Sequence, residues 1–571
     1  MFRTTLFTML AGLLMTSPLL RADDAPIRLT VHDDVLNPVD ARLFGHFMER
    51  ASWGEPGFDA ARDPDNPNRL QPAVVDKLEQ LSIPLIRFPA GTDLIRIDWR
   101  DMIDNVPGRE GGRPIFAKND GRTYTNAFGI DEFLALCEHL GAEPLLPVRF
   151  HPALFKHKPL DEAAREAAAL VAYCNAEIDA ELPEGMEDWP AVRARNGREK
   201  PWGVKYFQIG NETWHYYHKA MKKLGLDKAE TDEQADWYVK ARSAFLQAIH
   251  EIDPDVQIIV DGVASGHPWT DRTILGDEAL KKHDAIVALH MYQPWAMKWI
   301  ERDGERVAID NPSPEELWHA LTTAPAVNKQ TGQVRLPYWP DWWLVQDLGL
   351  KVAVTEWNWN GWWALGEDEP DPTLRSRFAR GLGAAGMLHA MMREGDRIKI
   401  GCQSMLVGVN WAIASVRVDE DGDNPPRIVP TGRVNGLYSK HHGHERLAVQ
   451  IADMPTYPQP LRINSFAPAP RVAAVDAVVT RSDKALYLHL INRHFSRDLP
   501  VAVDLAALDG LADQATHHRF VSDLQPNDKG VLRDTDGGRV ETAMIDRDGS
   551  TLRVTLPKRS VNIIEIPRQA P

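Results

Sequence analysis

The sequence predicts a (β/α)8 TIM barrel followed by a C-terminal β-sandwich, and three observations lead to this fold class. Between residues 41 and 440, short apolar segments alternate with amphipathic helical patterns. From residue 441 to residue 571, short strand-like segments separated by turn residues replace the helical patterns. No glycine-rich phosphate-binding turn follows the first strand-like segment, as an open doubly wound sheet would require. A chain of 571 residues is long enough for both domains.

Eight apolar segments are predicted to be the strands of the barrel, because helical patterns separate them in the order typical of a parallel barrel. One such helix, over 131–140, ends at Gly141, a residue that commonly terminates helices. The predicted strands are 42–47, 84–89, 144–149, 204–210, 256–261, 285–290, 350–355 and about 400–410.

The C-terminal region contains alternating segments such as 485–491 and 560–566, which are typical of a β-sandwich. A further strand-like segment, 27–32, precedes the barrel within residues 23–40. We expect this N-terminal strand to pair with the C-terminal domain and so to join the two ends of the chain.

Residues 1–22 have the pattern of a secretory signal peptide. A short start with one arginine is followed by an apolar run from Thr4 to about Leu20, and Ala22 precedes an acidic stretch. The run is interrupted by Pro18 and is too short to span a bilayer comfortably. We therefore expect cleavage after Ala22 and export to the periplasm or to the outside of the cell.

Composition excludes several classes of partner. The formal net charge is −16, which disfavours binding to nucleic acid or to an anionic membrane surface.

The three cysteines fit neither a zinc site nor a disulfide framework, so we expect buried free thiols, with a Cys137–Cys174 bridge as the alternative. The third cysteine is Cys402.

The chemistry is predicted from the ends of the fourth and seventh strands. Glu212 follows the apolar run 204–210, and Glu356 follows the run 350–355. The ends of barrel strands meet at one face, so these carboxylates would face each other across the barrel mouth. Two carboxyl groups about 5 Å apart are the arrangement for retaining glycoside hydrolysis. The alternative, that each glutamate merely pairs with a nearby cation, does not explain why both stand at such strand ends.

Other strand ends carry polar groups that could hold sugar hydroxyls, or could simply be packed and hydrogen-bonded. These residues are His46, Glu49, Arg87, Asp93, His290, Tyr292 and Gln403. For Arg87 and Asp93 two interpretations remain open, an ion pair below the site and a direct contact with sugar. The histidines, including His151 and the group 441–444, match no metal-ligand spacing, so no metal is expected.

Tryptophan is frequent, with 18 residues, and many lie near the second glutamate. They either pack in the core or stack on the faces of sugar rings, and the dense cluster favours stacking. Trp357, next to Glu356, is accordingly predicted to contact the substrate. The cluster consists of Trp339, Trp342, Trp343, Trp357, Trp359, Trp362 and Trp363.

Together these segments resemble glycoside hydrolase family 51, the α-L-arabinofuranosidases. The resemblance extends from residue 42 to about residue 438, and the family's C-terminal β-sandwich matches the remainder. The Gly-Asn-Glu element is shared by a whole clan of barrels, whereas its combination with FGHFMER and LHMY is more specific. The motifs are FGHFMER (44–50), IRFPAG (86–91), QIGNETW (208–214), LHMY (289–292), TEWNWN (355–360) and SMLVGVNW (404–411).

The resemblance implies a role for each matching residue. Glu212 would be the acid/base and Glu356 the nucleophile. Asn211 would bind the sugar 2-hydroxyl, and Glu49 the distal hydroxyls of the furanose. Tyr292 would hydrogen-bond the nucleophile, with His290 beside it, and Gln403 would be a further sugar contact. No cofactor is needed for this chemistry, and family members are often homo-oligomers.

Three departures from the family pattern lie near the expected mouth of the site. They are the Pro-Ala-Gly of 89–91, the segment 213–217 and the aromatic insertion 333–343. They leave open the sugar that is cleaved, and whether cleavage is exo or endo. The sequence therefore predicts release of terminal α-L-arabinofuranosyl residues from polysaccharides or oligosaccharides. The alternatives are a β-xylosidase, an endo-glucanase or another polysaccharide endo-hydrolase, and a catalytically dead sugar-binding protein.

Overall fold

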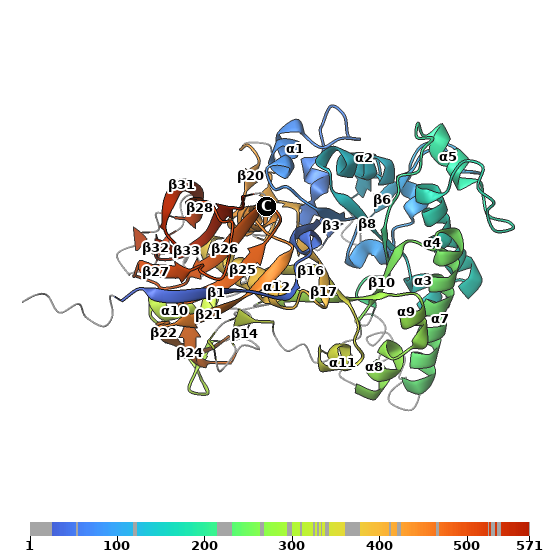
Figure 1. The fold of residues 1–571 in the computed structure, drawn as a ribbon. Helices are drawn as coiled ribbons and strands as arrows, with labels where there is room; N and C mark the ends of the chain where they lie inside the picture. Colours follow the sequence, from blue (N-terminus) through green and yellow to red (C-terminus); the bar gives the residue numbers. More distant parts are fainter. Residues whose placement is uncertain are drawn as a thin grey trace, which may run out of the picture.

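The computed structural model describes two closed sheets, one with helices around it and one built almost entirely from strands (Figure 1). No described helix is long and apolar enough to cross a membrane. The structure describes residues 25–52, 55–117, 123–213, 231–262, 268–293, 300–308, 311–323, 326–327, 331–332, 334–336, 342–359, 377–409, 413–419, 424–463, 467–522, 525–526, 532–533 and 538–569.

The first sheet is the predicted parallel barrel, and each of the eight predicted segments contributes a strand to it. Neighbouring strands pair in parallel around the ring, and β9 pairs with β10 as β17 pairs with β2. The strands are β2 (Gly45–Phe47), β5 (Leu85–Arg87), β8 (Glu143–Val148), β9 (Tyr206–Ile209), β10 (Gln257–Asp261), β11 (Ile286–Gln293), β16 (Val352–Trp359) and β17 (Ile398–Ser404).

The first strand is shorter than predicted. Residues 41–44 form a 3-10 helix, η2 (Ala41–Phe44), because the side chain of Asp40 accepts a hydrogen bond from the backbone N–H of Arg42. The strand then begins at Gly45, where a Cβ atom would lie 2.8 Å from the carbonyl oxygen of Gly401. In contrast, β16 is longer than predicted and includes Glu356, so this glutamate lies within the strand rather than after it.

The barrel interior is filled by apolar side chains, and the helices cover its outside. The longest described helices are α2 (Ile130–Leu140), α4 (Leu160–Asn175), α7 (Thr231–Ile252), α12 (Arg377–Arg393) and α13 (Pro430–Lys440). Helix α2 ends as predicted, since Gly141 adopts the left-handed conformation with a φ of 68°. Ten side chains fill the interior: Phe47, Leu85, Leu145, Tyr206, Ile259, Ile286, Ala288, Ala353, Ile400 and Cys402. All three cysteines are buried and free, so the expectation of free thiols is confirmed and the bridge is wrong.

The second sheet contains the N-terminal strand β1 (Ile27–Pro38), which runs beside the C-terminal strands in Figure 1. β1 pairs antiparallel with β21 and parallel with β27, so the strands form one closed sheet, where a sandwich would keep two sheets apart. The others are β21 (Glu445–Ala452), β25 (Val475–Arg481), β26 (Ala485–Asn492), β27 (Leu499–Asp504), β28 (Gln514–Val521), β31 (Arg539–Asp548), β32 (Thr551–Leu556) and β33 (Ser560–Pro567).

Charged groups at the junction of the two domains are buried and paired. Asp476 of β25 accepts hydrogen bonds from Arg493 at 2.9 Å, and Nδ1 of His389 on α12 lies 3.2 Å from its other oxygen. The hydroxyl of Tyr438 on α13 lies 2.7 Å from Nε2 of the same histidine. This network joins the helical layer of the barrel to the second domain, because its members come from both.

Candidate active site

The two predicted glutamates lie together at the carboxyl ends of their strands. Glu212 follows β9 and adopts a left-handed backbone conformation with a φ of 47°, two residues after Gly210, whose φ is 79°. Glu356 projects from β16 and is almost completely buried. One carboxylate oxygen of each glutamate and one ring nitrogen of His290 all lie within 4.8 Å of one another. The carboxyl groups are therefore close enough for the retaining arrangement.

Two side chains from β11 hold these carboxylates. Nδ1 of His290 lies 2.9 Å from Oε1 of Glu212 and 3.5 Å from Oε2 of Glu356, while Nε2 lies 3.1 Å from the hydroxyl of Thr355. Burial lowers the pKa of His290, but the carboxylates of Glu356 and Glu212 outweigh this and leave it above its ordinary value. The hydroxyl of Tyr292 donates to Oε2 of Glu356 at 2.7 Å. Burial and then Glu356 raise the pKa of Tyr292 well above its ordinary value, so the phenol keeps its proton.

Arg87, at the end of β5, lies fully buried below the site. Its Nη1 donates to Oε1 of Glu356 at 2.8 Å, its Nε donates to Gln208 at 3.0 Å, and its Nη2 donates to Oδ1 of Asn211. Of the two interpretations, this geometry matches the ion pair below the site, and its partner is Glu356. A cation held by Glu212, His290 and Glu356 would face this guanidinium, which disfavours a metal there.

Asn211 presents an unused donor. Its Oδ1 is taken by Arg87, but its Nδ2 is buried and has no hydrogen-bond partner in the described part of the chain. A buried donor without a partner is unfavourable unless a ligand completes it. This amide therefore points to a site for a ligand oxygen.

Glu49 forms another wall of the site. Its Oε1 accepts from the backbone N–H of Gly91 at 3.2 Å. A Cβ at Gly91 would lie 2.9 Å from this oxygen and 3.1 Å from Oε1 of Glu356, so both carboxylates flank one glycine. Burial, followed by Glu356 and Asp93, raises the pKa of Glu49 well above its ordinary value. The protonated form that this favours can both donate to and accept from a hydroxyl.

Asp261 and Thr213 are site residues that the sequence did not reveal. Asp261, the last residue of β10, accepts from the backbone N–H of Thr213 at 3.0 Å and from its hydroxyl at 2.9 Å. It thus fixes the residue that follows Glu212. Burial raises the pKa of Asp261 to about 6, although the bonds from Thr213 lower it. Its position at a strand end was a signal, but its partner depends on the fold.

Two predicted sugar contacts, Gln403 and Trp357, have fully buried side chains, and both contacts stay predictions. Gln403 is fully buried, accepts from the hydroxyl of Ser415 at 3.1 Å and donates to the carbonyl of Thr431 at 3.3 Å. Its polar groups are therefore occupied within the protein. Trp357 is also fully buried and belongs to the large core cluster, which is separate from the group of side chains inside the barrel. His46 is packed as well, and burial lowers its pKa to about 3.

Of the rest of the aromatic cluster, Trp359 is the one member whose side chain the structure describes. Trp359 is fully buried like Trp357. Trp339, Trp362 and Trp363 lie outside the described residues, as does the part of segment 213–217 that follows Thr213.

The known proteins to which this chain is similar are named as α-L-arabinofuranosidases. A family model described as "Alpha-L-arabinofuranosidase 1 domain" matches residues 77–311. The "Intracellular exo-alpha-(1->5)-L-arabinofuranosidase 1" of Bacillus subtilis is 23% identical, over 94% of this chain and 97% of its own. The "Intracellular exo-alpha-(1->5)-L-arabinofuranosidase" of Streptomyces lividans is 24% identical, over 93% of this chain and 74% of its own. The solved family 51 α-L-arabinofuranosidase of Bifidobacterium longum has 20% identity and a TM-score of 0.67, over 95% of this chain and 99% of its own, and shares the fold.

These names overturn the prediction of export. Both bacterial relatives are named intracellular enzymes, so the periplasmic or extracellular location was wrong. The prediction depended on the composition of residues 1–22 alone, and these lie outside the described residues. The three free thiols agree with the correction, because exported proteins commonly pair their cysteines.

Proposed function

We propose that this chain, which belongs to glycoside hydrolase family 51, releases terminal α-L-arabinofuranosyl residues from polysaccharides or oligosaccharides with retention of configuration. The observation that supports the proposal is that one carboxylate oxygen of Glu212 and one of Glu356 lie within 4.8 Å of each other and of a ring nitrogen of His290. At this separation no water fits between one carboxylate and the anomeric carbon, so the carboxylate itself attacks.

In the first step Glu356 is the nucleophile. Its oxygen forms a bond to the anomeric carbon as the glycosidic bond breaks, and Glu212 gives its proton to the leaving oxygen. Tyr292 and Arg87 each donate to one oxygen of Glu356, at 2.7 Å and 2.8 Å, and hold the carboxylate in a fixed orientation. Holding the carboxylate in this orientation lowers the entropic cost of reaching the reactive geometry.

In the second step Glu212, now ionised, accepts a proton from water. The resulting hydroxide attacks the anomeric carbon, the ester to Glu356 breaks, and arabinose leaves with its original configuration. His290 lies 2.9 Å from Glu212 and is held by Thr355, so it fixes the orientation of the acid/base in both steps.

Recognition of the sugar is assigned to Asn211 and Glu49. The free Nδ2 of Asn211 lies on the residue before the acid/base and would donate to the 2-hydroxyl. Glu49, whose neutral form is favoured, would exchange hydrogen bonds with the distal hydroxyls. The steps use only side chains of this chain. A homo-oligomer remains a prediction, and light scattering of the purified protein would test it.

The test is hydrolysis of p-nitrophenyl α-L-arabinofuranoside by the wild type and by Glu356→Ala. We expect turnover in the wild type and a loss of several powers of ten in kcat for the variant. Glu138→Ala is the matched control, since Glu138 forms an exposed ion pair with Arg198. A variant retaining more than about a tenth of kcat would contradict the assignment of the nucleophile.

Two further results decide the sugar and the stereochemistry. Cleavage of the β-xyloside or the β-glucoside in place of the arabinofuranoside would contradict the sugar. In buffer containing methanol, a retaining enzyme transfers arabinose to methanol with the α configuration, which proton NMR detects. Formation of the β-configured methyl glycoside would contradict the double displacement.

A further inference from the structure

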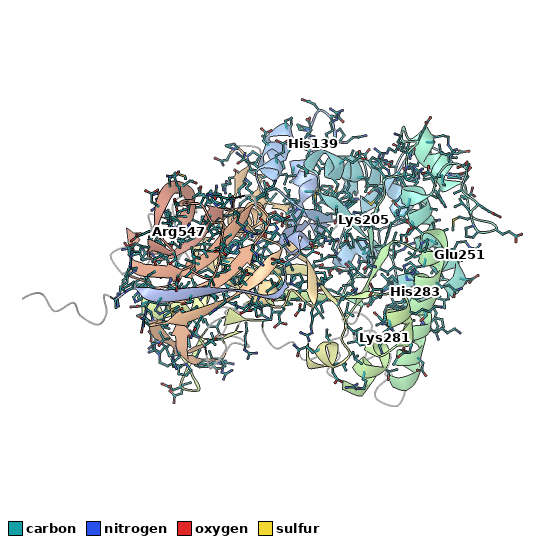
Figure 2. All side chains as sticks on the ribbon, viewed as in Figure 1. His139, Lys205, Glu251, Lys281, His283 and Arg547 are labelled. Carbon is teal, nitrogen blue, oxygen red and sulfur yellow. The ribbon has the colours of Figure 1, made fainter. Side chains whose placement is uncertain are left out.

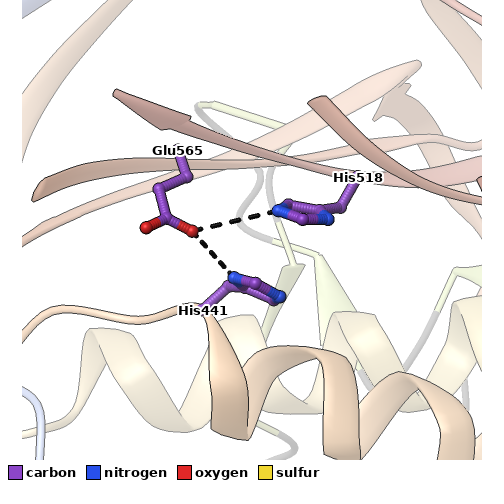
Figure 3. A group of neighbouring side chains, drawn as sticks. All are labelled: His441, His518 and Glu565. Atoms are coloured by element: carbon purple, nitrogen blue, oxygen red, sulfur yellow. Dashed lines mark hydrogen bonds and ion pairs between the residues drawn. The ribbon is translucent and has the colours of Figure 1, made fainter. Parts of the chain in front are cut away.

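A second cluster of metal-ligand residues lies at the junction of the two domains. His441 follows helix α13, whereas His518 and Glu565 lie on β28 and β33 of the second domain. Figure 3 shows both imidazole rings turned toward the same carboxylate oxygen. Nδ1 of His441 lies 2.9 Å from Oε2 of Glu565, and Nε2 of His518 lies 3.9 Å from it. One ligand atom of each residue lies within 4.8 Å of the others.

The register of the strands sets this cluster in place. Thr516 of β28 is paired with Glu565 of β33, and His518 lies two residues farther along the same strand. Residues two apart on a strand share a face, so His518 and Glu565 project from one side of the sheet toward His441. The two rings stack with centroids 3.9 Å apart and an interplanar angle of 27°. The two strands therefore fix His518 and Glu565, and the end of helix α13 supplies His441.

An ion pair alone accounts for only part of this arrangement. Nε2 of His518 is buried without a hydrogen-bond partner among the described residues, since Glu565 is too distant. The other nitrogen of that ring, Nδ1, lies 3.2 Å from the hydroxyl of Thr542. Metal-binding histidines are usually held in this way, with one nitrogen on a protein group and the other directed at the ion.

We propose that His441, His518 and Glu565 bind one divalent transition-metal ion of the zinc class, which links the barrel to the second domain. Two imidazoles and one carboxylate are a ligand set that zinc accepts, with a water molecule in the fourth position. Ligand atoms around tetrahedral zinc are about 3.3 Å apart, and the two distances to Glu565 lie on either side of this value.

The cluster lies where an ion can reach it from solvent. All three residues are half-buried, which leaves a path for the ion and room for the water ligand. The ion would stabilise the junction and take no part in hydrolysis.

The experiment is titration of the full-length protein with Zn²⁺ by calorimetry, after removal of metal with a chelator. We expect one Zn²⁺ per chain in the wild type, and a dissociation constant weakened about 10-fold or more in His518→Ala and Glu565→Gln. His139→Ala is the matched control (Figure 2), because His139 and Glu79 form an exposed pair at 2.8 Å that no third metal-ligand side chain joins among the described residues. Its affinity should equal that of the wild type.

A second measurement separates this cluster from the active site. Zn²⁺ bound at the junction should raise the melting temperature of the wild type but not that of His518→Ala, and should leave arabinofuranoside hydrolysis unchanged. Glu565→Gln keeps both rings and nearly the same shape, so it serves if His518→Ala does not fold. A folded wild type that binds no Zn²⁺, or equal binding in the variants, would overturn the proposal. Calorimetric Zn²⁺ binding that is lost in His290→Ala but kept in His518→Ala would overturn it as well.

Discussion

Arg87 donates to Oε1 of Glu356 at 2.8 Å from a position where it is fully buried, and the same guanidinium donates to Asn211. The nucleophile and the residue before the acid/base are thus oriented by one cation. A guanidinium can do this because its donors are arranged in a rigid planar fork, whereas an ammonium group is a single point charge.

Arg87→Lys should therefore lower kcat by about 100-fold or more, although the charge is kept. Lysine can reach Glu356 or Asn211 but cannot hold both in their present orientation. Steady-state kinetics on the aryl arabinofuranoside measures the loss. Arg42→Lys, at the half-buried pair with Asp40, is the control and should be close to the wild type. A nearly normal kcat in Arg87→Lys would show that the fork geometry is not needed.

Glu212→Ala should give a loss that depends on the leaving group. A nitrophenolate leaves without protonation, whereas the alkoxide of a sugar requires a proton from Glu212. We expect the fall in kcat/KM to be at least about 10-fold greater for an arabino-oligosaccharide than for the p-nitrophenyl substrate. Equal losses on both substrates would remove the acid role from Glu212. Glu356→Ala is the internal comparison, because the nucleophile is needed whatever the leaving group.

Asp261 should make stability depend on pH in a defined direction. Burial raises the pKa of Asp261 to about 6 in the folded protein, above its ordinary value. Between about pH 4 and pH 6 the folded state therefore binds a proton that the unfolded state does not. The stabilisation is complete below the unfolded pKa and is lost as pH rises through about 6, a change of about 3 kcal/mol.

Asp261→Asn removes this titration. The melting temperature of the wild type minus that of Asp261→Asn should be larger near pH 4.5 than near pH 7.5. Comparing this difference at the two pH values cancels the titration of groups common to both proteins. A difference that is constant, or larger at the higher pH, would mean that Asp261 does not bind the proton.

Gly91→Ala should disturb both carboxylates that flank this residue. The new Cβ would lie 2.9 Å from Glu49 and 3.1 Å from Glu356, closer than ordinary contact allows. We expect kcat/KM to fall about 10-fold or more, because the nucleophile would be displaced. Gly112→Ala is the matched control, since a Cβ there meets no atom of the described residues within 4 Å. Unchanged kinetics in Gly91→Ala would show that Glu49 and Glu356 can shift without loss.

The sequence predicted the barrel and the positions of Glu212 and Glu356, because strand ends can be recognised from apolar runs that stop at polar residues. Arg87 could be recognised as a candidate, but its choice of Glu356 as partner depends on strands β5 and β16 lying across the barrel from one another. The pairing of Asp261 with Thr213 is equally a property of the assembled barrel.

Trp357 shows a different limit of prediction from the sequence. Its position beside Glu356 suggested a sugar contact, yet neighbouring residues on a strand point to opposite faces. Because Glu356 points into the site, Trp357 packs into the layer under the helices. Alternation along the strand would have given this from the sequence. His518 and Glu565 could not be predicted as neighbours of His441, because the spacing of the histidines at 441–444 carries no information about residues far along the chain.

Strand β1 has a consequence for the order in which the chain is assembled during synthesis. Arg28 of β1 bonds to Asp453, which lies 425 positions later, and β27 is made later still. The ribosome therefore delivers β1 first and its two neighbours near the end, with the whole catalytic barrel in between. Both edges of β1 stay unpaired until then, and an unpaired edge is a site for association with other chains. Rapid barrel folding, which holds β1 close to the emerging C-terminal strands, would shorten that exposure.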